Sequence, residues 1–345
     1  MAKMKKAVTM ADIANKLDVS IVTISKALSG QKGVSNEMRG KIIALAREMG
    51  YRMPGGCVSG DETNGFRVGV LVPEGVLANY DSFYWRLYQA ISEKAISRNC
   101  FAGYENLTAD MVNSGGLPRM LADQMVDGLI LVGRPKAGYT EMLKKKTHLP
   151  VVYLDFYEND SDIDCFISDN FYGTYLLTEY LIKKGHRQIA FLGTLYETQS
   201  ITDRYLGFLK ALMEHGMNIP ENYIIQDRPI GGGTRDLYKK YRLPSPMPSA
   251  FVCNCDVAAV NLICELEAMG KKVPNDVSVV GFDHYPTKYS GYLGITTYEA
   301  DLGALAAQAL HSLIRQMKGE TFTKGIHIVE GKLIEKESVC FRNKS

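Results

Sequence analysis

The chain has 345 residues, of which 46% are hydrophobic and 10% are aromatic, and its formal net charge is +2. This composition can fill the cores of two or three domains. No apolar run approaches the roughly 20 residues needed to cross a bilayer, and the N-terminus lacks the apolar core of a signal peptide. We therefore expect a cytoplasmic protein that does not enter a membrane.

The cysteines and histidines do not suggest a metal site. The seven cysteines are scattered and odd in number, which is typical of reduced thiols in a cytosolic protein. Cys253 and Cys255 alternate along a predicted strand, so a metal-binding role is disfavoured for them. The six histidines show none of the usual ligand spacings. We expect neither a metal nor a cofactor.

Residues 10–28 contain two short amphipathic segments that meet at a turn. Thr9 is a plausible N-cap, and Asp12 follows three residues later, as in a capping box. Ile13 and Leu17 share one face of the first predicted helix. Asp18 and the residue after it form the turn. This arrangement is typical of a DNA-reading helix-turn-helix.

The second helix separates an apolar stripe from a face that can meet DNA. Ser20 caps this helix, and its buried stripe consists of Ile24, Ala27 and Leu28. The opposite face carries Ile21, Val22, Ser25 and Lys26. A third helix is predicted over residues 35–49, with Ile42, Leu45, Ala46 and Met49 inward and Gly50 where helices commonly stop.

Charge separates this head from the rest of the chain. Residues 1–52 hold ten Lys or Arg and four acids, a net charge of +6, whereas the remainder holds 30 and 34, a net charge of −4. Periodicity alone is equally compatible with a three-helix packing unit that never meets nucleic acid. The basic charge favours DNA binding, because the phosphate backbone attracts it.

From Phe66 onward, short hydrophobic runs alternate with amphipathic helical stretches. Runs that are apolar nearly throughout indicate parallel strands covered on both faces. The alternation breaks near residues 155–165 and then resumes, as two α/β lobes in series require. In such folds, ligands bind beyond the C-terminal ends of the strands, here in the cleft between the lobes.

The head resembles the DNA-binding head of the lactose-repressor and galactose-repressor family of bacterial transcription regulators. The matching positions are Met10, Asp12, Ile13, Ala14, Val19, Ser20, Thr23, Ile24 and Ser25. The resemblance continues through residues 167–193, the Arg204, Gly207 and Phe208 motif, residues 273–283 and residues 296–314. It therefore spans almost the whole chain.

The resemblance implies a helix-turn-helix domain followed by a two-lobed, periplasmic-binding-protein-like α/β core of parallel sheets flanked by helices. The expected domains are residues 1–52 for the head, 53–65 for a glycine-rich hinge linker and 66–345 for the core. By analogy the lobes exchange segments. The expected N-lobe is about 66–165 plus 295–325, and the C-lobe is about 166–292 plus 326–342.

The resemblance places effector contacts in the cleft. Arg204 and Asp283 are the leading candidates, because a guanidinium fork and a carboxylate together can grip vicinal hydroxyls. Alternatively, they pair with each other or with surface charges. Tyr84 and Trp85 match positions where relatives place aromatic rings against the ligand, although a core role for Trp85 is also open. Weaker candidates are Asp169, Cys255 and Asp256.

The residues expected to contact DNA are Thr9, Ser20, Ile21, Val22, Thr23, Ser25, Lys26 and Val58. The apolar pair Ile21 and Val22 can touch thymine methyls, whereas Lys26 can donate to guanine. Relatives carry a leucine that wedges into the minor groove from a hinge helix. Here three glycines disfavour such a helix, and Val58 would be a weak wedge.

These observations predict a DNA-binding repressor that works as a homodimer on a double-stranded operator, because one helix-turn-helix reads only a half-site. We expect a sugar or similarly polar effector in the cleft. One alternative keeps DNA binding but places control in a protein corepressor, and another is a plain solute-binding protein. An enzyme is disfavoured, because Gly231 to Gly233 lack the Lys-Ser/Thr of a phosphate-binding loop.

Overall fold

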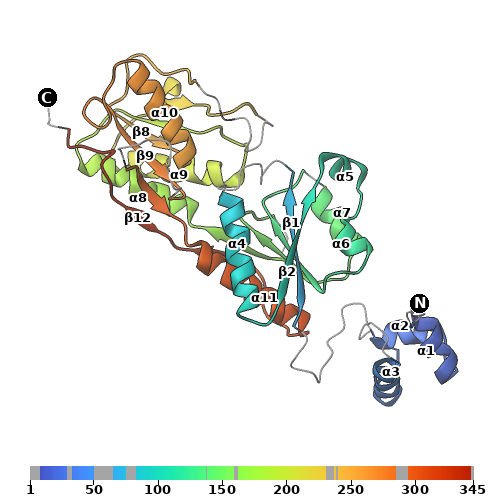
Figure 1. The fold of residues 1–345 in the computed structure, drawn as a ribbon. Helices are drawn as coiled ribbons and strands as arrows, with labels where there is room; N and C mark the ends of the chain where they lie inside the picture. The colour runs from blue at the N-terminus through green and yellow to red at the C-terminus, as the bar shows by residue number, and fades with distance from the viewer. Residues whose placement is uncertain are drawn as a thin grey trace, which may run out of the picture.

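The computed structural model describes residues 8–28, 33–49, 65–74, 83–136, 138–158, 162–230, 237, 240–284 and 294–342. Figure 1 shows a small helical head followed by two α/β lobes. Most of the expected hinge linker, including Val58, lies outside the described residues, as does the loop of Gly231 to Gly233. Within the described residues, no helix is long and apolar enough to span a membrane.

The head consists of three helices around a small apolar core. They are α1 (Met10–Leu17), α2 (Ile21–Leu28) and α3 (Asn36–Glu48). Ile13, Ile24 and Ile42 are fully buried where the helices meet. The predicted capping box is confirmed, since Thr9 Oγ1 accepts from the Asp12 N–H at 3.3 Å and Asp12 Oδ2 accepts from the Thr9 N–H at 2.7 Å. The expected helix-turn-helix is therefore present.

The first lobe is built on a six-stranded parallel sheet. Its strands are β1 (Arg67–Pro73), β2 (Phe101–Leu107), β3 (Gly128–Val132), β4 (Val151–Leu154), β5 (Asp164–Ser168) and β11 (Ile326–Val329). They lie in the order β11-β5-β4-β3-β1-β2. Because side chains alternate along a strand, Val68 and Val70 pack on one face and Leu71 on the other.

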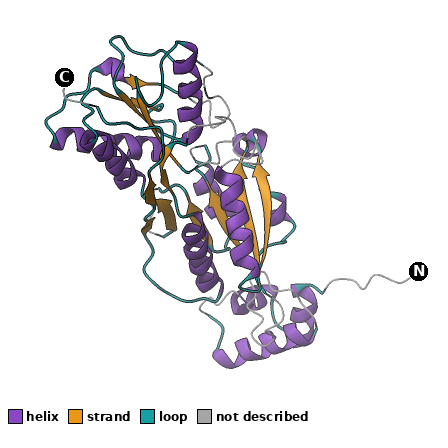
Figure 2. Ribbon diagram, turned by 60° about the vertical axis from the view of Figure 1, so that its left-hand side comes forward, coloured by secondary structure: helices purple, strands orange, loops and turns teal. Residues whose placement is uncertain are grey.

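Helices cover both faces of this first sheet, as Figure 2 shows. One face carries α4 (Phe83–Ile96) and α11 (Leu302–Met317). The other carries α5 (Ala109–Ser114), α6 (Arg119–Ala122) and α7 (Tyr139–Lys146). The nearly continuous apolar runs of the strands are explained by this double coverage.

The second lobe repeats the arrangement with a mixed sheet. Its strands are β6 (Ile189–Leu192), β7 (Ile224–Ile225), β8 (Ala250–Cys253), β9 (Ser278–Phe282), β10 (Thr296–Glu299) and β12 (Lys332–Ile334). The order is β12-β10-β9-β8-β6-β7, and β12 is antiparallel to β10. One face is covered by α8 (Asn170–Lys183) and α9 (Gln199–Glu214), and the other by α10 (Asp256–Ala268). A short 3-10 helix (Glu221–Tyr223) precedes β7.

The chain passes between the lobes three times, after β5, after β10 and after β11. The observed strands differ from the expected lobe boundaries at 295 and 326. β10 lies in the second sheet because Thr297 pairs with Gly281, and β11 lies in the first because His327 pairs with Phe166. Strand partners are set by contacts distant in sequence, so local patterning could not assign these two strands.

Candidate functional site

Polar side chains gather where the parallel strands of the two sheets end. Asp155 follows β4, and Asp227, Asn254 and Asp283 follow β7, β8 and β9. Because parallel strands end at the same edge of a sheet, the last three side chains share one edge. They frame Arg204, which reaches this edge from α9.

Arg204 is held by several partners within the second lobe. Its side chain is buried, with Nε donating to Asn170 Oδ1 at 2.8 Å and Nη1 donating to the Asn254 carbonyl. Nη2 donates to Asp283 Oδ1 at 3.2 Å, and the guanidinium lies 3.8 Å from the centre of the Phe282 ring. The two leading candidates therefore pair with each other, and their orientation is set before any ligand arrives.

Asp283 occupies a strained position. Its backbone lies in the left-handed region, with φ of 93°, as does that of His284, with φ of 48°. Burial raises the pKa of Asp283, although the positive charges of Arg204 and Arg86 oppose that rise. Strain of this kind persists where surrounding contacts over-determine it, and it clusters at ligand sites.

At the boundary between the lobes, the first lobe presents a second polar pair. Tyr84 at the start of α4 donates from its hydroxyl to Asp155 Oδ2 at 2.8 Å. Burial raises the pKa of Asp155 to about 6, while the Tyr84 hydrogen bond and the charge of Arg204 lower it. The charge of Asp283 also acts on Asp155, so the two pairs face one another between the lobes.

Asp155 was missed by the sequence analysis, although the sequence held a signal for it. The acid directly follows an apolar strand, as Asp283 does at the end of β9. Its backbone is also left-handed, with φ of 64°, which carries the side chain away from the strand direction. Asp155 and Asp283 each directly follow an apolar strand, one in each lobe, and this shared position could have identified Asp155 from the sequence.

Further hydrogen bonds join the lobes around these pairs, including one from the Tyr157 hydroxyl to Asp203 Oδ1 at 3.3 Å. Arg86 Nη1 donates to the His284 carbonyl at 3.2 Å, and the Tyr157 backbone N–H donates to Gln199 Oε1 at 3.1 Å. Both contacts join a residue of the first lobe to one of the second. Direct hydrogen bonds therefore link the two lobes beside these pairs.

Trp85 and Tyr84 are adjacent in the sequence, but their side chains contact different parts of the structure. Trp85 packs 5.5 Å from Tyr88 and 6.3 Å from Tyr104, measured between ring centroids. This aromatic cluster lies over edge strand β2, whereas Tyr84 hydrogen-bonds Asp155. The structure therefore brings Tyr84, and not Trp85, to the Arg204 and Asp283 pair.

The weaker candidates have local structural roles or lie beside the site. Asp169 caps α8 by accepting from the Tyr172 N–H at 3.0 Å. Asp256 is buried and accepts from Thr297 Oγ1 at 2.8 Å. Burial raises the pKa of Cys255 to about 12, so its thiol is neutral, and the charge of Asp283 adds to that rise. Cys255 therefore borders the site as an uncharged group.

A buried ion pair adjoins the Arg204 pair and was also missed. Arg228 Nη2 donates to Asp227 Oδ2 at 2.7 Å, and Asn254 Nδ2 donates to the same carboxylate at 2.6 Å. Burial opposes ionisation of Asp227, but the hydrogen bond and charge of Arg228 and the hydrogen bonds from Asn254 and the Thr194 backbone together outweigh it, so the pKa lies below its ordinary value. Because Asn254 also binds Arg204 through its carbonyl, this pair supports the wall of the site.

The head presents the expected face of α2 to solvent. Ile21 and Val22 are 53% and 62% exposed, which is unusual for such apolar side chains in a small domain, and Ser25 and Lys26 are also exposed. Ser20 Oγ accepts from the Thr23 N–H at 3.0 Å and caps the helix. Thr9, Ser20 and Thr23 have local hydrogen bonds, and the side chains of Ile21, Val22, Ser25 and Lys26 are exposed to solvent.

The described residues contain no group of three or more His, Cys, Asp or Glu side chains arranged to hold a metal ion. The site instead consists of paired charges, a phenol and amide groups. Such groups recognise a ligand through hydrogen bonds.

Comparisons with known proteins agree with this architecture. Residues 9–53 match the bacterial regulatory proteins of the lacI family, and residues 178–339 match the periplasmic binding protein-like domain. The chain is 28% identical over 343 residues to the HTH-type transcriptional repressor PurR of Escherichia coli, covering 96% of this chain and 97% of that protein.

Solved structures share the fold over nearly the whole chain. A complex of the transcriptional regulator CelR with cellobiose has a TM-score of 0.67 and 22% identity, covering 96% of this chain and 99% of that one. The lac repressor dimer bound to operator and the anti-inducer ONPF has a TM-score of 0.64 and 20% identity, covering 97% and 100%. With a matching helix-turn-helix head joined to a matching two-lobed core, the chain is a member of the lacI family of bacterial transcriptional regulators.

Proposed function

We propose that this protein is a cytoplasmic, homodimeric repressor that binds a two-fold symmetric operator and responds to a small polar effector between its lobes. The observation that carries the proposal is the pair of facing groups in the cleft. Arg204 with Asp283 comes from one lobe and Tyr84 with Asp155 from the other. A ligand that contacts both pairs stabilises one relative position of the lobes.

The charges of the site favour an uncharged, hydroxyl-rich ligand. Arg204 and Asp283 offset each other, and the Asp155 pKa of about 6 reflects the cost of burying an unpaired carboxylate. Hydroxyl groups can donate to the carboxylates and accept from the guanidinium. A sugar fits these requirements, and the relatives described with cellobiose and with bound ribose are consistent with that class.

The effector then acts on DNA through linkage. If it binds one lobe arrangement more tightly, it shifts the population of that arrangement and with it the spacing of the two heads in the dimer. The reciprocal also holds, since operator binding changes effector affinity by the same factor. Two heads are required because each reads one half-site.

The first experiment is selection of operator DNA from a random library by the purified full-length protein. We expect a two-fold symmetric site to be enriched, because a dimer presents two equivalent recognition helices. Enrichment of an unpaired half-site would contradict the homodimer. No enrichment at moderate salt would contradict autonomous operator binding and favour a required corepressor.

The second experiment uses the selected DNA to find the effector. Fluorescence anisotropy of labelled operator, measured against a panel of neutral sugars, should reveal compounds that shift the apparent affinity. Tyr84→Phe should weaken the response, because it removes the hydroxyl that binds Asp155. Tyr88→Phe is the matched control, since its hydroxyl lies one turn along α4 and contacts only the Ala102 carbonyl in this region. Equal responses of the two variants would contradict a role for the Tyr84 hydroxyl in the effector site, and no response to any sugar would favour a protein corepressor.

A further inference from the structure

The first lobe has a cavity at the edge of its sheet opposite the edge that carries Asp155. Its lining includes Lys144 at the end of α7, Val151 at the start of β4 and Ile163 just before β5. The other side is lined by Gln316 in the last turn of α11 and by Gly319, Glu320, Thr321, Phe322 and Lys324 in the segment that leads to β11, and the cavity volume is about 470 Å³. This volume is ample for a small molecule.

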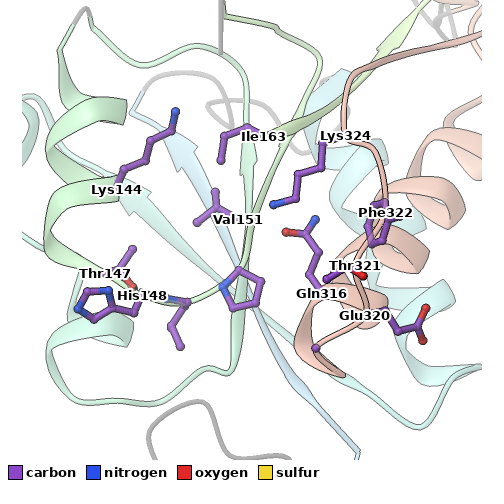
Figure 3. Close-up of a pocket in the computed structure, with 13 residues that line it drawn as sticks. Lys144, Thr147, His148, Val151, Ile163, Gln316, Glu320, Thr321, Phe322 and Lys324 are labelled. Atoms are coloured by element: carbon purple, nitrogen blue, oxygen red, sulfur yellow. Dashed lines mark hydrogen bonds between the residues drawn. The ribbon is translucent and has the colours of Figure 1, made fainter. Parts of the chain in front are cut away.

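The cavity combines an apolar floor with two ammonium groups. Val151 and Ile163 form the floor, while Lys144 and Lys324 project from opposite walls, as Figure 3 shows. Lys324 Nζ donates to the Asp162 carbonyl at 3.0 Å, which fixes its position beside the floor. An ammonium group held over an apolar surface suits an anion attached to an apolar body.

The one acidic side chain among the lining residues, Glu320, is directed elsewhere. Glu320 accepts from Arg315 Nε at 2.6 Å, and in Figure 3 its side chain points away from the other lining residues. His148 also points outward in this view. Among the lining residues, the two lysines Lys144 and Lys324 thus outnumber the single acid, whereas Arg204 and Asp283 between the lobes are paired with each other.

The lining is connected to two of the segments that pass between the lobes. Gln316 Nε2 donates to Ser312 Oγ at 3.1 Å, and Ser312 donates to the buried carboxylate of Asp164. Asp164 also accepts from the Gly325 N–H at 2.9 Å and faces His327 at 3.1 Å. These bonds tie α11, β5 and β11 together beside the cavity, and α11 and β11 adjoin interlobe passages.

The cavity also lies at the edge where the head joins the core. β1, β3 and β4 run parallel, so Arg67 at the start of β1 and Val151 at the start of β4 share this edge. We propose that the cavity is a binding site for a small organic anion, a phosphate or carboxylate carried on an apolar body. A backbone phosphate of DNA has the charge but no apolar group to cover Val151 and Ile163.

The test uses phenyl phosphate as the probe and the full-length protein with labelled methyl groups. Saturable shifts of the Val151 and Ile163 methyl resonances are expected, with none for Ile201 on α9 near the cleft. Phenol, which lacks the anion, should bind far more weakly. No saturable shift, or shifts confined to Ile201, would overturn the proposal, and shifts of Val151 and Ile163 on adding duplex DNA alone would reassign the anion to the DNA backbone.

Charge variants provide the matched comparison. Lys144→Gln and Lys324→Gln should each weaken phenyl phosphate binding by about tenfold, the loss of one charge-assisted contact. Lys145→Gln should leave it unchanged, because that exposed lysine is on the same helix but does not line the cavity. If Lys144→Gln and Lys145→Gln behave alike, the site does not bind through these ammonium groups. If Lys144→Gln or Lys324→Gln fails to fold, the other variant alone tests the proposal.

Discussion

The buried carboxyl of Asp155 makes a quantitative prediction about stability. Burial raises its pKa from 3.8 to about 6. The folded protein thus holds this proton more tightly than the unfolded chain does. The difference of about two pKa units corresponds to roughly 3 kcal/mol. Ionisation of Asp155 therefore lowers the free energy of unfolding. This loss of stability is absent near pH 3, develops between about pH 4 and pH 6, and is complete above that range.

Asp155→Asn should remove this cost, because the amide cannot ionise. Asn tolerates the left-handed backbone of this position, where φ is 64°, and its carbonyl oxygen can accept from the Tyr84 hydroxyl. We expect the variant to be more stable than the native chain by up to roughly 3 kcal/mol at pH 8 and about equally stable near pH 3.5. The variant should also lose its response to the effector, because a residue that destabilises the fold is commonly kept for its function.

Urea unfolding of both proteins across this pH range measures the difference directly. A carbon-13 NMR titration of the Asp155 carboxyl gives its midpoint independently, with the Asp155→Asn spectrum identifying the resonance. A stability difference that does not change with pH, or a midpoint near 4, would refute the assignment of a buried, mostly unpaired carboxyl. A stabilised variant that retains full effector response would show that Asp155 does not contact the effector.

Four other changes test the head and the second lobe. Lys26→Ala should weaken operator binding and alter base preference in a repeated DNA selection, and equal weakening on all sequences would make it a phosphate contact. Thr9→Ala should destabilise α1 by about 1 kcal/mol, measured by amide exchange, whereas Thr9→Ser should not. Gly207→Ala should cost about 1–3 kcal/mol in urea unfolding, because its Cβ would lie 1.9 Å from the Phe171 carbonyl oxygen. Gly40→Ala, with open space around it, should instead stabilise α3 by up to about 1 kcal/mol, and a loss comparable to that of Gly207→Ala would contradict the steric reasoning.

Local patterns predicted the head with its caps and the alternation of strands and helices in the core. The bond between Thr9 and Asp12 spans three residues, and the buried stripe of α2 repeats with the helical period. Such features depend on neighbours in the chain, so they can be read from the sequence. The family resemblance extended this reading to Arg204 and Asp283, which the structure places in one ion pair.

Local patterns could not predict the direction in which a side chain points or which strands pair across long stretches of sequence. Tyr84 and Trp85 are adjacent, but successive residues of a helix point about 100° apart, so only the packing of α4 on its sheet decides which ring enters the cleft. Whether a strand belongs to one sheet or the other, as for β10 and β11, depends on partners more than a dozen residues away.

The sequence by itself determined that this chain has a basic helix-turn-helix head and an α/β core, because charge and periodicity are properties of neighbouring residues. Only the tertiary structure decided that Asp155 faces Arg204 and Asp283, and that Lys144 and Lys324 share a cavity. These groups are brought together by the pairing of parallel strands and by the interlobe passages. Both depend on the summed burial of distant apolar faces, which no single segment of the sequence records.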